Sequence, residues 1–220
     1  MRLYSGPLSM FGAKARIALL EKGIACEIVN VPFDWDRGYD PKHAEVARIN
    51  PKRQVPVLVD GDLELFDSSL IFEYFEDIKP EPALWPREAK ARARARLTEL
   101  KSDEVFFPII MKLMGRPGED VARAARENAQ RFHADIEQQL GDRAFLCGDA
   151  LSYADIAFYL AQLWGERWTA PMPQSAPRLL AWRERMTRRA SVREAAATIV
   201  AYLVSQDQPI PPFLAELKAP

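Results

Sequence analysis

The chain has 220 residues, of which 48% are hydrophobic and 28% are charged. This balance is typical of a folded globular protein and excludes a mainly disordered chain or a fibrous repeat. The 30 basic and 31 acidic residues leave a formal net charge of -1, so no overall positive field favours a nucleic-acid partner.

The first part of the chain alternates strand and helix patterns. Residues 3–4 and 26–31 have the character of short strands, while residues 11–22 place apolar side chains on one helix face. Gly23 follows as a helix stop. The connection between the two strands is long enough for them to pair in parallel. We therefore predict a strand, helix, strand unit at the start of the chain.

A hairpin and a further helix come next. Residues 55–59 and 63–66 are predicted strands on either side of Asp60-Gly61, a dipeptide that favours a tight turn. A helix follows to about Ile78, because the Asp67-Ser68 pair supplies a capping side chain at its start. This second pair of strands is therefore expected to be antiparallel.

The character of the chain changes near residue 79. Three prolines interrupt residues 80–86, which cannot continue a helix or a strand and form a linker. Beyond it, helical spacing is found over residues 87–114, 121–140, 152–168 and 177–189, with a shorter helix over 191–203. We predict an α/β domain at 1–79, a linker at 80–86 and an all-helical domain at 87–220.

The cysteines and histidines are few and widely spaced. Cys26 and Cys147 form neither a redox pair nor a zinc spacing, and His43 and His133 give little support to a metal site. No apolar run approaches the roughly 20 residues that cross a bilayer, and residues 1–7 are too polar for a secretory signal. We expect a cytoplasmic protein without disulfides, metal or a membrane partner.

Val55-Pro56 heads a predicted strand. This proline is either an ordinary strand-entry residue or part of a cis peptide bond. A cis bond would turn the amide and carbonyl of Val55 outward, where an extended peptide can pair with them. The segment is therefore a candidate peptide-docking edge.

Two helix starts have a similar double interpretation. Asp67-Ser68 is either a simple cap or a site where a carboxylate meets an ammonium and free helix amides meet a carboxylate, as an amino-acid head group requires. Ser9 is either the cap of the first helix or a hydroxyl that donates to a bound thiolate. Such a donor, at the positive end of a helix, lowers a thiol pKa from its ordinary value of about 8.5.

The order of these features resembles the soluble glutathione transferase superfamily. That resemblance implies a thioredoxin-like domain, with the order strand, helix, strand, helix, strand, strand, helix and a mixed four-stranded sheet, followed by a helical bundle. Residues 145–156 look like the capping segment of the family's C-terminal domain, in which Ser152 and Asp155 cap the next helix. The chain is most similar to the serine-type branch.

The resemblance assigns the catalytic hydroxyl to Ser9, which would stabilise the glutathione thiolate. Met10 stands where a proline often follows the catalytic residue in the family, so the chain departs from the family pattern at this turn. Tyr4 is the second choice, and Ser5 also lies near the position of the catalytic tyrosine of other branches. Because position 9 is not a cysteine, thiol–disulfide exchange through a mixed disulfide is disfavoured.

The resemblance also implies the remaining site residues. Glutathione would be bound by Lys42 and Gln54 at its glycyl end, by Val55 and the cis Pro56 at its cysteinyl part, and by Asp67 and Ser68 at its γ-glutamyl group. The apolar second substrate is expected between the domains, against Phe106, Phe107, Met111, Met114, Trp164, Trp168 and Phe213. The basic helix after the linker often contributes to a dimer interface in the family, so a homodimer is expected.

The predicted function is a detoxifying glutathione transferase that joins the glutathione thiolate to an apolar electrophile. Two other functions stay open on the same fold. One is a non-catalytic glutathione-binding or protein-interaction module, and the other is a specialised glutathione-dependent isomerase or dehalogenase. All of them share the first domain, so its motifs do not separate them.

Overall fold

The computed structural model describes residues 1–218 and divides into two compact units. Of the described residues, the first unit contains 1–83, 194–208 and 217–218, and the second contains 84–193 and 209–216. The first boundary falls inside the predicted linker. The last two residues of the predicted helical domain, 219–220, lie outside the described residues.

The first unit is built on a four-stranded sheet with the spatial order β2-β1-β3-β4. Its strands are β1 (Arg2–Ser5), β2 (Glu27–Asn30), β3 (Val57–Asp60) and β4 (Leu63–Phe66). β1 pairs with β2 in parallel, whereas β3 is antiparallel to both β1 and β4. Gly61 has a φ of 61° in the tight turn between β3 and β4, a conformation that glycine adopts readily. The predicted mixed sheet is confirmed.

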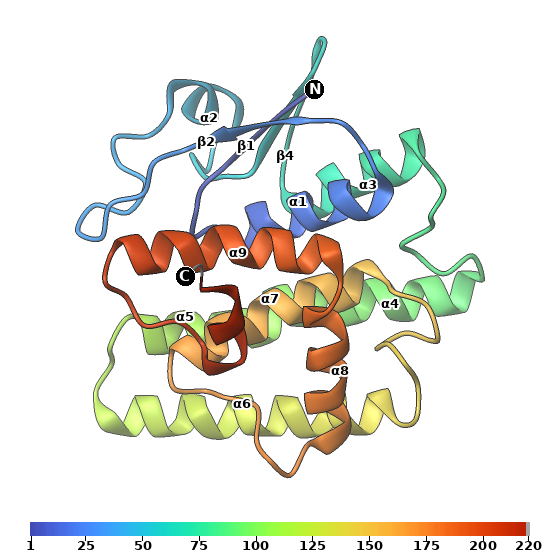
Figure 1. Ribbon diagram of the computed structural model, residues 1–220, viewed down its shortest axis with the longest axis vertical. Coiled ribbons are helices and arrows are strands. Elements are labelled where there is room, and N and C mark those ends of the chain that lie inside the picture. Colours follow the sequence, from blue (N-terminus) through green and yellow to red (C-terminus); the bar gives the residue numbers. More distant parts are fainter. Residues whose placement is uncertain (219–220) are drawn as a thin grey trace. The chain divides into compact units, whose positions relative to one another are not determined.

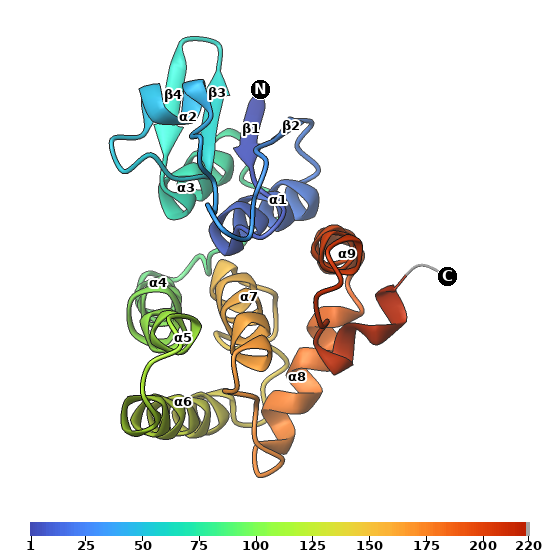
Figure 2. The ribbon, with the colours of Figure 1, turned by 90° about the vertical axis from the view of Figure 1, so that its left-hand side faces the viewer.

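Helices cover both faces of this sheet, because successive side chains along β1 and β3 point to opposite faces and both sets are buried. They are α1 (Met10–Lys22), α2 (Ala44–Ile49) and α3 (Ser68–Ile78). α1 and α3 pack on each other at one face of the sheet (Figure 2). Leu3 and Leu58, which pair across β1 and β3, are fully buried. Tyr4 and Val57 belong instead to a core cluster with Val46 of α2. Successive strand residues thus serve opposite layers.

Lys22, the last residue of α1, connects this helix to the end of α3 and the segment that follows it. Its Nζ donates to the carbonyl oxygens of Lys79 at 2.6 Å and Pro82 at 2.9 Å, and it pairs with Glu76 at 2.7 Å. The side chain is fully buried. A buried ammonium is tolerated here because three oxygens replace its water shell.

The last long helix, α9 (Ala190–Ser205), does not follow the predicted division into domains. From Glu194 onward it groups with the first unit, although residues 87–220 were all expected in the helical domain. Arg16 of α1 donates to Thr198 at 2.8 Å and to Glu194 at 3.1 Å. Helical spacing predicts the helix but not the unit on which it packs.

The second unit is helical throughout, as predicted. Its helices are α4 (Ala89–Lys101), α5 (Phe107–Met114), α6 (Glu119–Leu140), α7 (Tyr153–Arg167) and α8 (Pro177–Thr187), with a 3-10 helix at Pro212–Leu217 (Figure 1). Every residue of α7 from Tyr153 to Gly165 is buried. α7 therefore forms the centre of this unit. Within residues 1–218, no helix has both the length and the apolar character needed to cross a membrane.

A π turn over Ser102–Phe106 joins α4 to α5 inside the predicted helix 87–114. The amide of Phe107 bonds to the carbonyl of Ser102, five residues back. Pro108 follows, and its ring nitrogen has no hydrogen to donate to the carbonyl four residues earlier. The wider turn accommodates this missing bond without ending the helix.

The predicted capping box at the start of α7 is confirmed. Asp155 accepts the amide N–H of Ser152 at 2.9 Å and its hydroxyl at 2.6 Å. The same fully buried carboxylate accepts the amide of Leu146 at 2.8 Å and the indole N–H of Trp182 at 2.9 Å. Asp155 therefore joins the preceding loop, α7 and α8 in one polar cluster.

Candidate functional site

One row of residues aligns the chain segments that carry the candidate site. Tyr4 pairs with Val57, and Val57 pairs with Phe66. Because β3 runs opposite to β1 and β4, the end of β1, the start of β3 and the end of β4 meet at one edge of the sheet. The segments bearing Ser9 and Asp67 follow β1 and β4 at this edge, and Val55 precedes β3 there.

Ser9 closes a tight turn and begins α1. Its amide donates to the carbonyl of Gly6 at 3.1 Å, and Pro7 occupies the second position of the turn, where proline is favoured. The Ser9 hydroxyl oxygen accepts the amide N–H of Gly12 at 2.9 Å. A hydroxyl that accepts in this way keeps its own proton for donation. Ser9 therefore caps α1, whose first residue is Met10. Its O–H keeps a proton that it can donate to a ligand.

Gly12 is a site residue that the sequence analysis missed. A Cβ at this position would lie 2.1 Å from the Oγ of Ser5 and 3.1 Å from the Oγ of Ser9. Any larger residue would therefore push both serines away. The available signal was a glycine inside the first turn of a helix, where it costs roughly 1 kcal/mol relative to alanine.

The Val55–Pro56 peptide bond is cis, as the resemblance implied. Within residues 1–218, the amide and the carbonyl of Val55 have no hydrogen-bond partner. Val55 is half-buried and Pro56 is buried. An extended backbone can pair with such free groups as an added strand would.

Asn50 shapes the loop that leads to Val55, a role not foreseen from the sequence. Its Nδ2 donates to the carbonyl of Gln54 at 2.6 Å, and its Oδ1 accepts the amide of Lys52 at 2.9 Å. Asn50 is only 4% exposed, whereas Gln54 is exposed. The signal was an asparagine before proline, which here serves as a buried turn organiser.

Asp67 begins α3, as predicted. Its Oδ1 accepts the amides of Ser69 at 2.9 Å and Leu70 at 3.2 Å. The φ of Asp67 is 78°, an uncommon value for a residue other than glycine. Asp67 is exposed and Ser68 is buried beside it. A carboxylate and a helix N-terminus thus lie together at the sheet edge.

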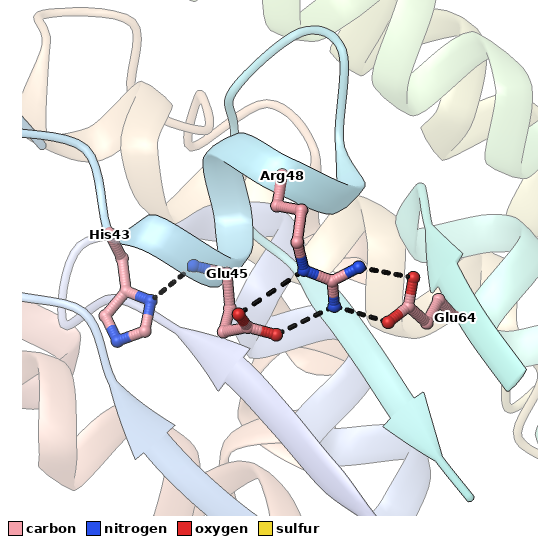
Figure 3. A network of polar contacts seen from close by, with 4 residues as sticks. All are labelled: His43, Glu45, Arg48 and Glu64. Carbon is pink, nitrogen blue, oxygen red and sulfur yellow. Dashed lines mark hydrogen bonds and ion pairs between the residues drawn. The ribbon is translucent and has the colours of Figure 1, made fainter. Parts of the chain in front are cut away.

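A polar network holds α2 against β4 (Figure 3). Arg48 of α2 pairs with Glu45 at 2.8 Å and donates to Glu64 of β4 at 2.9 Å, with a second, shorter Arg48–Glu64 contact. Hydrogen bonds from Arg48 hold the pKa values of the Glu45 and Glu64 carboxyls below their ordinary range. The Nδ1 of His43 accepts the amide of Glu45 at 3.3 Å and caps the helix.

Lys42 directly precedes this capping histidine. Its Nζ lies 3.8 Å from the Oδ1 of Asp40, and its side chain is 24% exposed. The Arg48 network therefore fixes the helix from whose start Lys42 extends. The Lys42 ammonium thus lies near the Asp40 carboxylate and is partly exposed.

Tyr4 and Ser5 differ in their surroundings. Tyr4 is 2% exposed and packs in the core between the sheet and α2, with its ring 5.1 Å from that of His43. Ser5 is also buried, with its Oγ against the backbone of Gly12. Ser9 is the hydroxyl that stands at the N-terminus of α1.

The candidate lining residues of the apolar substrate all belong to the second unit. Phe106 is fully buried, and its ring packs on Phe132, His133 and Phe158. It is therefore a core residue of the bundle and not an exposed lining residue. The remaining candidates vary from buried to exposed: Phe107, Met111, Met114, Trp164, Trp168 and Phe213.

The protein's own thiols are poorly suited to act as nucleophiles. Burial raises the pKa of Cys26 above its ordinary value and raises the pKa of Cys147 to about 11. Both thiols therefore stay protonated near neutral pH. Among residues 1–218, no three His, Cys, Asp or Glu side chains are grouped to hold a metal ion.

Comparison with known proteins agrees with this architecture. Residues 3–83 match the family model "Glutathione S-transferase, N-terminal domain", and residues 97–190 match "Glutathione S-transferase, C-terminal domain". A solved glutathione S-transferase from Rhodospirillum rubrum superposes with a TM-score of 0.76 and 31% identity, over 88% of this chain and 90% of that one.

Two curated relatives carry different names. The stringent starvation protein A homolog of Coxiella burnetii is 32% identical over 157 residues, which are 70% of this chain and 71% of that protein. Glutathione S-transferase U25 of Arabidopsis thaliana is 28% identical over 191 residues, or 84% of this chain and 83% of that protein. Fold, domain matches and relatives agree that the chain belongs to the glutathione transferase superfamily.

Proposed function

We propose that this protein is a glutathione transferase that binds glutathione along the sheet edge and activates its thiol with Ser9. The observation that carries the proposal is the free amide and carbonyl of Val55 at the edge where Ser9 and Asp67 also lie. Glutathione is an extended peptide with a thiol, an ammonium and two carboxylates. These are the groups for which this edge offers complementary partners.

Each part of glutathione has a proposed partner. The backbone of Val55, held before the cis Pro56, pairs with the cysteinyl residue. Asp67 binds the γ-glutamyl ammonium, while Ser68, at the positive N-terminal end of α3, binds its carboxylate. The ammonium of Lys42 and the exposed side chain of Gln54 bind the glycyl carboxylate.

The proposed chemistry is attack by the glutathione thiolate on an electrophilic carbon. A sulfur–carbon bond forms, and either a leaving group departs with its electron pair or the substrate takes up a proton after addition. Ser9 donates a hydrogen bond to the thiolate, and the positive end of α1 favours the same charged form. The protein supplies charge stabilisation and positioning without a covalent intermediate.

The reactive sulfur in this proposal arrives with the substrate. Cys26 and Cys147 have raised pKa values, so neither competes as a thiolate near neutrality. We propose that the electrophile is apolar and contacts side chains of the second unit: Phe107, Met111, Met114, Trp164, Trp168 and Phe213. A role in detoxification, in the cytoplasm, is part of the same proposal.

We also propose that the protein is a homodimer. Leu97 and Leu100 of α4 and Val105 of the π turn are about half exposed, at 49%, 52% and 50%. Leu97 and Leu100 are three residues apart and so lie close together on the surface of α4. The same helix bears the exposed basic residues Lys90 and Arg94. A second copy of the chain would cover this surface. Light scattering coupled to size exclusion tests this directly, since Leu97→Glu with Leu100→Glu should leave a monomer.

One alternative function has specific support. The Coxiella burnetii relative is named for stringent starvation and not for transfer to an electrophile. A glutathione-binding module without turnover, serving protein interaction, would keep the same sheet edge. The isomerase or dehalogenase alternative would keep Ser9 as well, and only the second substrate would differ.

The experiment that separates these functions combines calorimetry with turnover. Wild-type protein is titrated with glutathione and assayed with a broad panel of aromatic, alkyl halide and isomerisable electrophiles. We expect Ser9→Ala to bind glutathione within a few-fold of wild type and to lose most of its turnover. Ser175→Ala, in an exposed loop of the second unit, is the matched control. Binding without turnover of any electrophile would favour the module.

A further inference from the structure

The ring of Tyr39, in the segment between β2 and α2, lies directly on the turn that presents Ser9. A Cβ on Gly6 would come within 2.1 Å of the Cε1 of Tyr39 and within 2.4 Å of its hydroxyl oxygen. Gly6 is therefore required because the tyrosine ring occupies the place of a side chain. This close approach joins segments 33 residues apart in the sequence.

The Tyr39 hydroxyl completes the hydrogen bonding of the same turn. Within the turn, the amide of Ser9 bonds to the carbonyl of Gly6. The amide of Leu8, one residue before Ser9, donates instead to the hydroxyl oxygen of Tyr39 at 3.3 Å. Burial raises the pKa of Tyr39 well above its ordinary value, so the phenol keeps its proton while its oxygen accepts the Leu8 amide.

The Tyr39 ring also contacts Phe33, which in turn contacts Tyr202 of α9. Phe33 meets Tyr39 edge to face with a ring separation of 5.0 Å, and it meets Tyr202 of α9 at 6.2 Å. The hydroxyl of Tyr202 donates to the carbonyl of Phe33 at 2.8 Å. Edge-to-face geometry is the favoured arrangement for such rings.

Two chains of contacts therefore connect α9 to the segments on either side of Ser9. One route runs from Tyr202 through Phe33 and Tyr39 to the turn before Ser9. The other runs from Glu194 and Thr198 to Arg16 of α1, the helix that Ser9 caps. The Oγ of Ser9 occupies one of a few staggered rotamers relative to its own backbone, so its direction depends on how firmly the backbone on both sides is held.

We propose that Tyr39 is a positioning residue for Ser9, and that Tyr202 on α9 supports it through Phe33. The inference deepens the proposed transferase function and rests on it. Tyr39 holds the turn so that the Ser9 hydroxyl points toward the thiolate of bound glutathione. In this proposal α9 supports the chemistry of the first unit without contacting the substrate.

The test begins with Tyr39→Phe, which keeps the ring and removes the hydroxyl. The pKa of the bound glutathione thiol is followed by the ultraviolet absorbance of the thiolate against pH, together with kcat and KM. We expect a higher thiol pKa and a kcat lower by about fivefold, with little change in KM for glutathione, because one hydrogen bond of ordinary strength is lost. Tyr202→Phe should shift both quantities in the same direction by less.

Two comparisons distinguish positioning from general loss of structure. Tyr74→Phe is the matched control, because its hydroxyl bonds to Asp60 at 2.6 Å in the same unit and away from the turn. It should leave the thiol pKa and kcat unchanged. In a Ser9→Ala background, Tyr39→Phe should have no further effect on kcat, since a residue that acts through Ser9 has nothing left to position. Additive losses would overturn the proposal.

A readout without glutathione separates this inference from the proposed function. Hydrogen exchange at the Leu8 amide should be faster in Tyr39→Phe and in Gly6→Ala than in wild type or Tyr74→Phe. If exchange is unchanged in both variants, the positioning contact is overturned. If exchange responds while wild-type protein binds no glutathione, the contact stands but Tyr39 has no thiolate to serve, and the positioning role falls with the transferase function.

Discussion

The hydroxyl oxygen of Ser9 accepts the amide N–H of Gly12 at 2.9 Å, and the lack of a side chain on Gly12 leaves room for this bond. A methyl group there would meet the Oγ of Ser5 at 2.1 Å. The helix cap, the candidate catalytic hydroxyl and a glycine are thus parts of one arrangement.

Gly12→Ala should displace Ser5 and Ser9, so that kcat falls sharply while the protein still folds. The expected cost in unfolding free energy is about 1–3 kcal/mol, which is typical of an extra buried methyl group. Removing the obstructing hydroxyl in the Ser5→Ala, Gly12→Ala double variant should restore part of the kcat lost by Gly12→Ala. Steady-state kinetics on the three variants checks this, and equal kcat in the single and double variants would contradict it.

Asp155 joins three elements of the helical unit through one carboxylate. Burial raises its pKa, and the hydrogen bonds from Leu146, Ser152 and Trp182 oppose that rise. Asp155→Ala leaves these buried donors without an acceptor and should lower the free energy of unfolding by about 3 kcal/mol or more. Urea unfolding followed by tryptophan fluorescence measures the loss. Asp142→Ala, at an exposed carboxylate, is the control, and similar midpoints for both variants would refute this role.

Lys22 has three oxygen partners and no exposed surface. Lys22→Met keeps the length of the side chain but leaves Glu76 and two carbonyl groups without this donor, so unfolding should become easier by about 3 kcal/mol. The Lys22→Met, Glu76→Leu double variant should recover part of that loss, since no carboxylate is then stranded. Circular dichroism during urea unfolding is the measurement, and a loss below about 1 kcal/mol would contradict this stabilising role of Lys22.

His133 gives the helical unit a predicted pH dependence. Both ring nitrogens lack a hydrogen-bond partner within residues 1–218, and burial, with a smaller effect of Arg183, lowers the pKa of His133 to about 4 from 6.5. The unfolded chain therefore takes up a proton before the folded one. The free energy of unfolding is therefore unaffected by the titration of His133 above pH 6.5. Protonation of this residue lowers that free energy as the pH drops from 6.5 toward 4, by on the order of 3 kcal/mol in total.

The variant His133→Leu removes this titration. Its unfolding free energy should fall less steeply than that of wild type between pH 6.5 and 4, and the two slopes should agree above that interval. Urea unfolding at several pH values gives both curves. Parallel curves across the whole range would mean that another group carries the acid sensitivity.

Sequence patterns anticipated much of this molecule because many of its features depend on residues a few positions apart. The Asp60-Gly61 turn, the Asp67 cap and the Ser152–Asp155 capping box are each set by contacts within three residues, and all are found. The resemblance carried by these features also implied the cis Pro56 and the two-domain architecture. Such local signals identify elements and their ends.

Other features depend on which faces pack together, and local patterns do not determine that. Helical spacing could not separate Phe106, a core residue of the bundle, from residues available to a substrate. The same limit applies to α9, whose pattern predicts a helix but not its grouping with the first unit.

Apart from α2, which only the family resemblance implied, the sequence by itself determined the order of strands and helices, the caps and turns, and the family, because each depends on short-range geometry and side-chain chemistry. Only the tertiary structure decided that Tyr4, Val57 and Phe66 align in one row and bring Ser9, Val55 and Asp67 to a common edge. It also decided that Tyr39 reaches Gly6 and Leu8. These contacts join distant segments, whose register is selected by the burial of whole faces and not by any neighbouring residue.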